Sequence, residues 1–167
     1  MAMHRSKGYF FNYFREVGAA FQGSHLIYTA MGGTGCWSYV GRVAGGRGQR
    51  INLGSPRCVN VGTVIHETLH ALGWSIYSSR LFDLFLGAVH EQSRPDRDLY
   101  VNILWANIKT GKEHNFNKTS SATHSGRGTP FDPDSIMIYG PKNFGKDDGK
   151  GGKETTIQPL DPNVQIK

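Results

Sequence analysis

This sequence contains no run of 18 apolar residues, which excludes a membrane-spanning helix of ordinary length. Residues 9–14 are aromatic, but they are too few and too polar to form the core of a signal peptide. Cysteine is scarce, with Cys36 and Cys58 its two occurrences among 167 residues. Such a pair is compatible with two buried thiols or with one disulfide. At 167 residues, the chain is long enough for one domain with its own hydrophobic core.

Acidic residues are outnumbered, with 13 Asp and Glu against 19 Lys and Arg, and the formal net charge is +6. An anionic partner is one interpretation of this excess. The basic residues are scattered, however, and neither an aromatic-basic patch nor a nucleic-acid motif accompanies them. We therefore interpret the charge as solvated surface and expect neither a nucleic acid nor a membrane as partner.

Helical periodicity marks residues 61–73, VGTVIHETLHALG. Apolar residues recur there at helical spacing and predict a buried helix with an apolar stripe formed by Val61, Ile65, Leu69 and Leu72. Asn60 is expected to cap the start of this helix, and Gly73 is expected to follow its end. The helix therefore has both a start and a stop signal.

Two histidines, His66 and His70, stand one turn apart on a neighbouring face of the same helix. Imidazoles at this spacing can bind one zinc ion, and Glu67 between them can act as general base on a water. The same pattern also arises by chance, as two exposed histidines beside a solvated glutamate. The rest of the sequence has to decide between these interpretations.

Three further stretches accompany the histidine pair. They are residues 35–42 (GCWSYVGR), 90–98 (HEQSRPDRD) and 135–140 (SIMIYG). In this order they resemble the astacin family of zinc endopeptidases, metzincins with the signature HExxHxxGxxHExxRxDRD and a Met-turn reading SIMxYG. The resemblance covers residues 24–166, and several motifs in the right order make it highly specific.

The resemblance implies an α+β fold. It predicts a metzincin-like catalytic domain with a small mixed sheet over the zinc-binding helix and a lower subdomain that is mostly irregular. Residues 24–167 would form this domain, incomplete and truncated at both ends relative to the family, and residues 1–23 stay unassigned. Within it, strands are expected at residues 24–30, 37–43 and 51–53, with a turn at 44–50. Trp105, Ile108 and Phe116 are expected in the core.

The resemblance also assigns roles to individual residues. It implies that His90 is the third ligand of one zinc ion, that Glu67 is the catalytic base, and that Tyr139 stabilises the oxyanion. Met137 would pack beneath the histidines without binding metal.

Two further structural roles follow from the same resemblance. Cys36 and Cys58 would form a disulfide, which indicates an oxidising compartment. Cys36, Trp37 and Ser38 would lie on an edge strand that pairs with a peptide substrate through main-chain groups.

One feature departs from the family pattern. The position of the third histidine holds Ile76, and the matching His90 is displaced by fourteen residues, 74–87. Fourteen more helical residues would carry the chain about 21 Å along the helix axis, so His90 requires this segment to loop out. Glu91, which follows at the spacing of a carboxylate ligand from a second helix, is a less favoured third ligand. We hypothesise that residues 74–87 are an in-frame intron read as coding sequence, because the flanks join into a complete signature without them.

The predicted function is therefore zinc-dependent hydrolysis of peptide bonds, with a peptide or protein as substrate. The resemblance implies an extracellular location, although the chain as given shows no signal peptide. A rival prediction is a catalytically impaired relative that keeps the peptide-binding cleft but binds zinc weakly through a displaced third ligand. Substrate preference and oligomeric state do not follow from the sequence.

Overall fold

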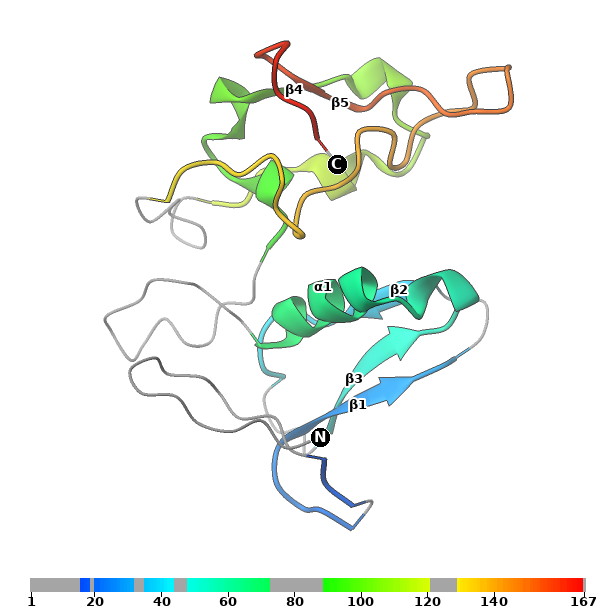
Figure 1. Ribbon diagram of the computed structural model, residues 1–167, viewed down its shortest axis with the longest axis vertical. Coiled ribbons are helices and arrows are strands. Elements are labelled where there is room, and N and C mark those ends of the chain that lie inside the picture. The colour runs from blue at the N-terminus through cyan, green and yellow to red at the C-terminus, as the bar shows by residue number, and fades with distance from the viewer. Residues whose placement is uncertain are drawn as a thin grey trace.

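The structure is a computed structural model that describes residues 16–18, 20–31, 35–43, 48–72, 89–120 and 129–166. Figure 1 shows two parts, one with a helix on a sheet and one with short elements joined by irregular chain. We call the described residues 16–72 the N-terminal half and the described residues 89–166 the C-terminal half. Gly73, Ile76, the segment 74–87 and the hypothesis about its origin lie outside the described residues.

The N-terminal half contains a three-stranded sheet in the order β1-β3-β2. The central strand β3 (Gly48–Leu53) runs parallel to β1 (His25–Thr29) and antiparallel to β2 (Cys36–Ser38). This confirms the small mixed sheet. The turn expected at 44–50 was wrong for residues 48–50, because β3 pairs on both sides and these residues complete its pairing with β1.

The strand expected at residues 37–43 is shorter in the structure, since β2 ends at Ser38. Gly41 adopts a φ of 74°, in the left-handed region that favours glycine. Its N–H donates to the carbonyl of His70 at 2.8 Å instead of to a neighbouring strand. The chain therefore leaves the sheet after β2 and turns toward the end of the helix.

Helix α1 (Val61–Leu72) lies against β2 and β3. Asn60 caps it as expected, because its Oδ1 accepts from the Thr63 N–H at 2.9 Å. The four stripe residues were expected to be buried, but Val61 is 77% and Ile65 is 44% exposed, and Leu69 and Leu72 are half-buried. Strands β2 and β3 contact the helix elsewhere, and its buried residues are Glu67, His70 and Ala71.

The C-terminal half is mostly irregular, as expected. Strands β4 (Val101–Ile103) and β5 (Ile157–Pro159) form an antiparallel pair. The remaining regular elements described there are short 3-10 helices: η3 (Glu91–Ser93), η4 (Arg97–Leu99), η5 (Trp105–Asn107) and η6 (Glu113–Phe116). Across the described residues, no helix has the length and apolar character needed to cross a membrane.

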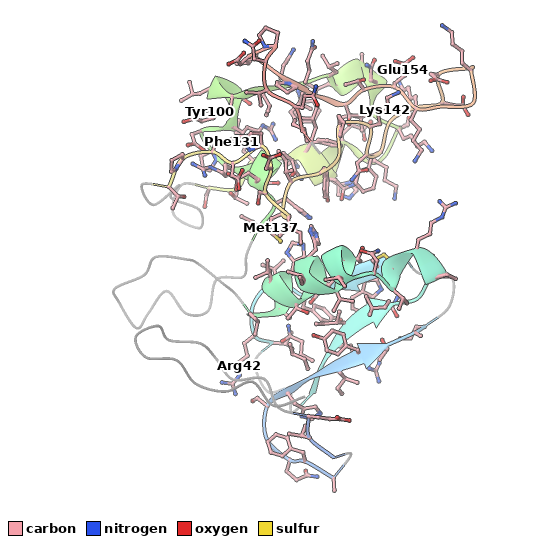
Figure 2. The ribbon with its side chains drawn as sticks, viewed as in Figure 1. Arg42, Tyr100, Phe131, Met137, Lys142 and Glu154 are labelled. Atoms are coloured by element: carbon pink, nitrogen blue, oxygen red, sulfur yellow. A yellow bond between two sulfur atoms is a disulfide. The ribbon has the colours of Figure 1, made fainter. Side chains whose placement is uncertain are left out.

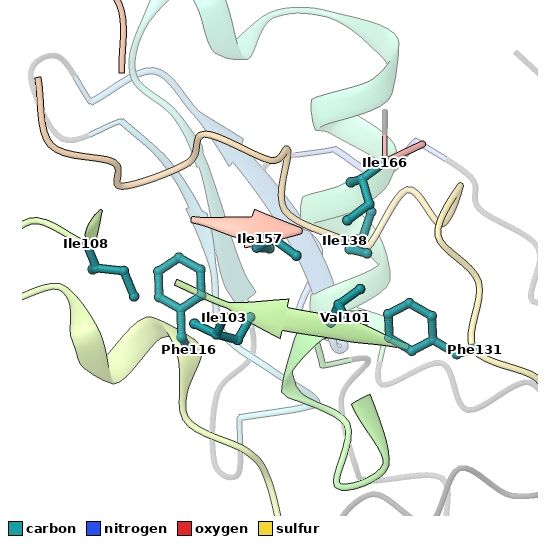
Figure 3. Close-up of a cluster of buried hydrophobic side chains, with 8 residues drawn as sticks. All are labelled: Val101, Ile103, Ile108, Phe116, Phe131, Ile138, Ile157 and Ile166. Carbon is teal, nitrogen blue, oxygen red and sulfur yellow. The ribbon is translucent and has the colours of Figure 1, made fainter. Parts of the chain in front are cut away.

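A cluster of buried side chains holds the C-terminal half together (Figure 3): Val101, Ile103, Ile108, Phe116, Phe131, Ile138, Ile157 and Ile166. Ile108 and Phe116 are buried as expected. Trp105 was expected in the core but is 46% exposed. Its ring instead meets the edge of Phe116 and lies beneath the guanidinium of Arg97, which explains an aromatic residue at this surface.

Candidate metal centre

Helix α1 brings two imidazoles to one point. His66 and His70 stand one turn apart, and their Nε2 atoms lie 3.1 Å from each other. The rings meet edge to face, with centroids 4.7 Å apart. His70 is buried, whereas His66 is half-buried.

His90 joins this pair from the C-terminal half. It stands immediately before η3, and its Nε2 lies 3.3 Å from the Nε2 of His66. One ligand atom from each of the three histidines lies within 4.8 Å of the other two. The displaced histidine therefore reaches the same point as the helical pair.

The Nε2 atom of His66 lies 3.1 Å from that of His70 and 3.3 Å from that of His90, close to the separation that zinc requires. Tetrahedral zinc with Zn–N bonds of about 2.0–2.1 Å holds two ligand nitrogens roughly 3.3 Å apart. Nδ1 of His66 lies 2.7 Å from the carbonyl oxygen of Ile136. A carbonyl only accepts, so Nδ1 carries the proton and Nε2 keeps its lone pair for a metal.

The electrostatics of His90 also suit a metal ligand. Burial, and then electrostatic repulsion from His70 and His66, lower the pKa of His90 to about 3. The ring is therefore neutral at physiological pH, and neutral imidazole is the form that binds a metal. No proton has to leave this ring before a metal can bind.

Glu67 lies on the same helix between the two ligating positions and is 6% exposed. Burial raises the pKa of its carboxyl to about 7. A carboxyl whose pKa lies near neutrality can both accept and return a proton at working pH. The helix thus presents an acid–base group next to the histidine cluster.

Tyr139 of the C-terminal half lies beside the histidine cluster. Its ring lies against His90 with centroids 4.2 Å apart and also contacts Phe116 and Phe144. Burial, and then the charge of Glu67, raise the pKa of the phenol to about 12. The hydroxyl therefore stays protonated near neutral pH and can donate a hydrogen bond.

Glu91 has other partners. Its Oε1 accepts from Arg94 Nη1 at 3.0 Å and from the Asp132 N–H at 2.9 Å. The three-histidine group does not include it. Glu91 therefore anchors a turn in the C-terminal half, which leaves His90 as the residue that completes the cluster.

Met137 is buried in the turn between Ser135 and Tyr139, at 7% exposure. Figure 2 shows it on the side of the C-terminal half that faces α1. Its carbonyl accepts from the Glu91 N–H at 3.0 Å, and this bond ties the turn to the segment that carries His90.

Strand β2 is an edge strand beside α1 and carries Cys36, Trp37 and Ser38. It pairs with β3 on one side, with Trp37 opposite Asn52. The disulfide between Cys36 and Cys58 is present, which confirms that prediction. It ties the edge strand to the turn that precedes α1.

Sequence reasoning missed two groups that shape this site. The carbonyl of Ile136 orients His66, and no side-chain pattern reveals a backbone acceptor. Gln92 is fully buried, and its Oε1 accepts from the Tyr139 N–H at 3.0 Å. A glutamine among the four other polar residues of HEQSR resembles surface sequence, so only its burial in the fold identifies it.

Known proteins resemble this chain over most of its length. The family model Astacin, which describes a family of peptidases, matches residues 12–167. Blastula protease 10 of Paracentrotus lividus is 39% identical over 135 residues, which are 81% of this chain and 19% of that protein. Meprin A subunit beta of Rattus norvegicus is 39% identical over 125 residues, 75% of this chain and 15% of that protein.

A solved structure shows the same relationship. High choriolytic enzyme 1, a hatching enzyme zinc-protease from Oryzias latipes, aligns with a TM-score of 0.67 and 34% identity over 90% of this chain and 63% of that one. Of the two curated relatives, blastula protease 10 and meprin A subunit beta, the chain spans about a fifth of the length or less. Its histidine cluster is a zinc site of the three-histidine type. On the match over residues 12–167, the chain belongs to the astacin family of peptidases.

Proposed function

We propose that this chain is a zinc-dependent endopeptidase that hydrolyses peptide bonds in peptide or protein substrates. The observation that carries the proposal is the convergence of His66, His70 and His90 within 4.8 Å, beside the buried carboxyl of Glu67. In this proposal the three histidines hold one zinc ion through their Nε2 atoms. Zinc supplies Lewis acidity, which polarises a carbonyl and makes water a better nucleophile near neutral pH.

Glu67 is proposed as the general base. It takes a proton from the attacking water and delivers it to the amine nitrogen as the peptide C–N bond breaks. Its raised pKa, about 7, supports both steps, because neither protonation state is strongly disfavoured near neutral pH. Glu67 acts in this mechanism without being a ligand.

Tyr139 is proposed to donate a hydrogen bond to the oxyanion that develops on the carbonyl oxygen. Two observations support this role: its ring packs on His90, and its phenol remains protonated well above neutral pH. A donor fixed in advance in a partly buried site stabilises developing charge more than a mobile one in water. Met137 is proposed to support the His90 segment from beneath.

The free edge of β2 is proposed to bind the substrate as an added antiparallel strand at Cys36, Trp37 and Ser38. The disulfide to Cys58 supports this, because it fixes the strand relative to α1. The same disulfide supports an oxidising, extracellular location. We retain residues 24–167 as the proposed peptidase domain, although the family match begins at residue 12.

The test is Glu67→Gln in the zinc-loaded chain. Loss of the base should lower peptidase activity by roughly 10²-fold to 10⁴-fold. Zinc content, measured by atomic emission, should be unchanged because the three imidazoles remain. Glu113→Gln, at an exposed glutamate of η6, is the matched control and should keep full activity.

Two outcomes would contradict this assignment. Activity above a few per cent in a zinc-replete Glu67→Gln protein would exclude Glu67 as the base. A zinc-loaded wild-type chain that binds peptides but cleaves none would favour the impaired relative with a retained cleft.

A further inference from the structure

We propose that Asn117 is a site of N-linked glycosylation, an inference that rests on the proposed extracellular location. Asn117, Lys118 and Thr119 form the one Asn-x-Ser/Thr sequence among the 167 residues. Asn117 is exposed, and its backbone is extended, with φ −64° and ψ 140°, immediately after η6. A glycan on this side chain would extend into solvent.

The neighbouring residues show why a glycan is compatible with the fold. Phe116 is fully buried and packs edge-on against Tyr139, whereas the next two residues are exposed. The Phe116 side chain points into the core and Asn117 lies on the surface, so a glycan at position 117 displaces no core side chain.

Thr119 limits when the modification can take place. In the folded chain its N–H and its hydroxyl both donate to the carbonyl of Ser93, at 2.8 and 3.0 Å. The hydroxyl is thus engaged, and the transferase has to act before this segment folds. The amide nitrogen of Asn117 then displaces a polyprenyl diphosphate from the anomeric carbon of an oligosaccharide, loses one proton and forms the N-glycosidic bond.

The experiment is expression of the full chain behind a cleavable leader in a eukaryotic secretory host. Mass spectrometry should find one glycopeptide, carrying Asn117, and peptide N-glycosidase should leave aspartate at that position. Asn117→Gln should abolish the modification and leave peptidase activity unchanged. Asn115→Gln, two residues earlier and outside the motif, is the matched control and should stay modified.

Thr119→Ser and Thr119→Ala separate recognition from folding. Thr119→Ser should keep the glycan, and Thr119→Ala should lose it. Unmodified Asn117 in both the secreted protein and the protein retained in the secretory organelles of the host would overturn the proposal. The peptidase assay is independent of this readout, so failure of one proposal is distinguishable from failure of the other.

We infer separately that Gln92 is a positioning residue for Tyr139, an inference that deepens the proposed function. Gln92 is 0% exposed, and its Oε1 accepts from the Tyr139 N–H at 3.0 Å. Its backbone carbonyl accepts from Arg97 Nη1 at 2.7 Å. The backbone of Gln92 is therefore held in place by Arg97, and the side-chain oxygen of Gln92 holds the backbone of Tyr139.

Glu91, the residue before Gln92, forms a second hydrogen bond to the turn that contains Tyr139. The Glu91 N–H donates to Met137, two residues before Tyr139. Two bonds from neighbouring positions thus hold the turn of Tyr139 against the segment that begins at His90. The Tyr139 ring contacts His90 across this pairing, with centroids 4.2 Å apart. Gln92 sets the distance between the two rings through the Tyr139 backbone.

The acceptor is the part of Gln92 that does this. Its Nε2 has no hydrogen-bond partner among the described residues. Gln92→Met keeps the shape and removes the acceptor, whereas Gln92→Glu keeps an oxygen at the same place. Gln158→Met, at an exposed glutamine of β5, is the matched control.

The first readout needs no activity. In a ¹⁵N-tyrosine-labelled chain, the Tyr139 amide should lose protection from hydrogen exchange in Gln92→Met and keep it in Gln92→Glu and Gln158→Met. The second readout is kinetic. Gln92→Met should lower kcat roughly tenfold to a hundredfold with little change in KM, because misplacement on the order of 1 Å costs up to about a hundredfold.

A double-mutant cycle separates positioning from general damage. If Gln92 acts through Tyr139, Gln92→Met should have little further effect on kcat in a Tyr139→Phe background. Equal losses in both backgrounds would overturn the inference, as would an unchanged Tyr139 amide. Loss of zinc in Gln92→Met at saturating metal would also overturn it, since the residue would then act through the ligands.

Discussion

The two halves of the molecule both contribute residues to the proposed site, but they differ in how many hydrophobic residues they bury. Among the described residues, the N-terminal half buries three hydrophobic residues, Ile51, Cys58 and Ala71, whereas the C-terminal half buries nine. Several large apolar side chains of α1 and its sheet remain exposed instead, including Tyr28, Val61 and Ile65. The difference indicates that the helix with the proposed base and two of the histidines depends on its disulfide, cap and sheet more than on a core.

The site joins these unequal halves. His66, Glu67 and His70 come from the N-terminal half, and His90 and Tyr139 come from the C-terminal half. Bound zinc would therefore tie a thinly packed half to a well packed one. A ligand that binds only the folded state stabilises it by mass action, so zinc should stabilise the N-terminal half most.

The largest effect is expected in the C-terminal core. Phe116 is fully buried within a ring cluster, so Phe116→Ala should destabilise the fold by about 3–5 kcal/mol. Ile65→Ala is the matched change on α1, where 44% exposure and the helix propensity of alanine should keep the loss under about 0.5 kcal/mol. Urea unfolding measures both. A similar loss in the two variants would contradict the comparison.

The contrast also explains which features the sequence predicted. Residue spacing on a single element specified α1, its Asn60 cap and its pair of histidines, because these depend on neighbours within a turn. The resemblance supplied the disulfide, the mixed sheet and the role of His90. Each of these pairs residues that are distant in sequence, and periodicity alone does not specify such pairs.

The failures arise from tertiary context. The stripe of α1 was expected to be buried, but burial depends on which face the sheet covers, and Val61 and Ile65 lie off that face. Residues 39–43 have strand-like composition, yet Gly41 bonds to the end of α1 instead. Gln92 has a surface-like sequence environment and a fully buried position. None of these outcomes is encoded locally.

The disulfide should have the next largest effect. Replacing it by Cys36→Ser with Cys58→Ala should cost about 3 kcal/mol, since it closes a loop of 22 residues. Hydrogen exchange should show the loosening in β2 and α1 and leave the C-terminal core protected. Uniform loss of protection across both halves would mean that they unfold as one unit.

The cap of α1 should contribute less. Asn60 accepts from the Thr63 N–H and donates to the Arg57 carbonyl, so Asn60→Ala should cost roughly 1 kcal/mol. Asn60→Asp is the control that keeps the acceptor. The first turn of α1 contains no acidic residue, so the added charge should also interact favourably with the helix dipole. Aspartate cannot donate to the Arg57 carbonyl, so thermal unfolding should rank Asp at or below Asn, and Ala below both.

The smallest effect is expected at a surface ion pair of the C-terminal half. Hydrogen bonds from Lys118, and then from Arg97, hold the pKa of Asp98 below its usual value. A carboxyl with a lowered pKa stabilises the fold above its unfolded pKa of about 3.9, and this contribution is lost as the pH falls through the lower folded value. Asp98 is 58% exposed, so solvent screening limits the contribution to about 1 kcal/mol or less.

Asp98→Asn should therefore lower the free energy of unfolding at pH 7, and the deficit should shrink below about pH 4 and in high salt. Glu154→Gln, at an exposed glutamate of the same half, is the control for loss of one negative charge. Urea unfolding at pH 7 and pH 3 makes the comparison. A deficit that persists at pH 3 would assign the effect of Asp98 to packing, and the ion pair would then contribute nothing to the C-terminal half.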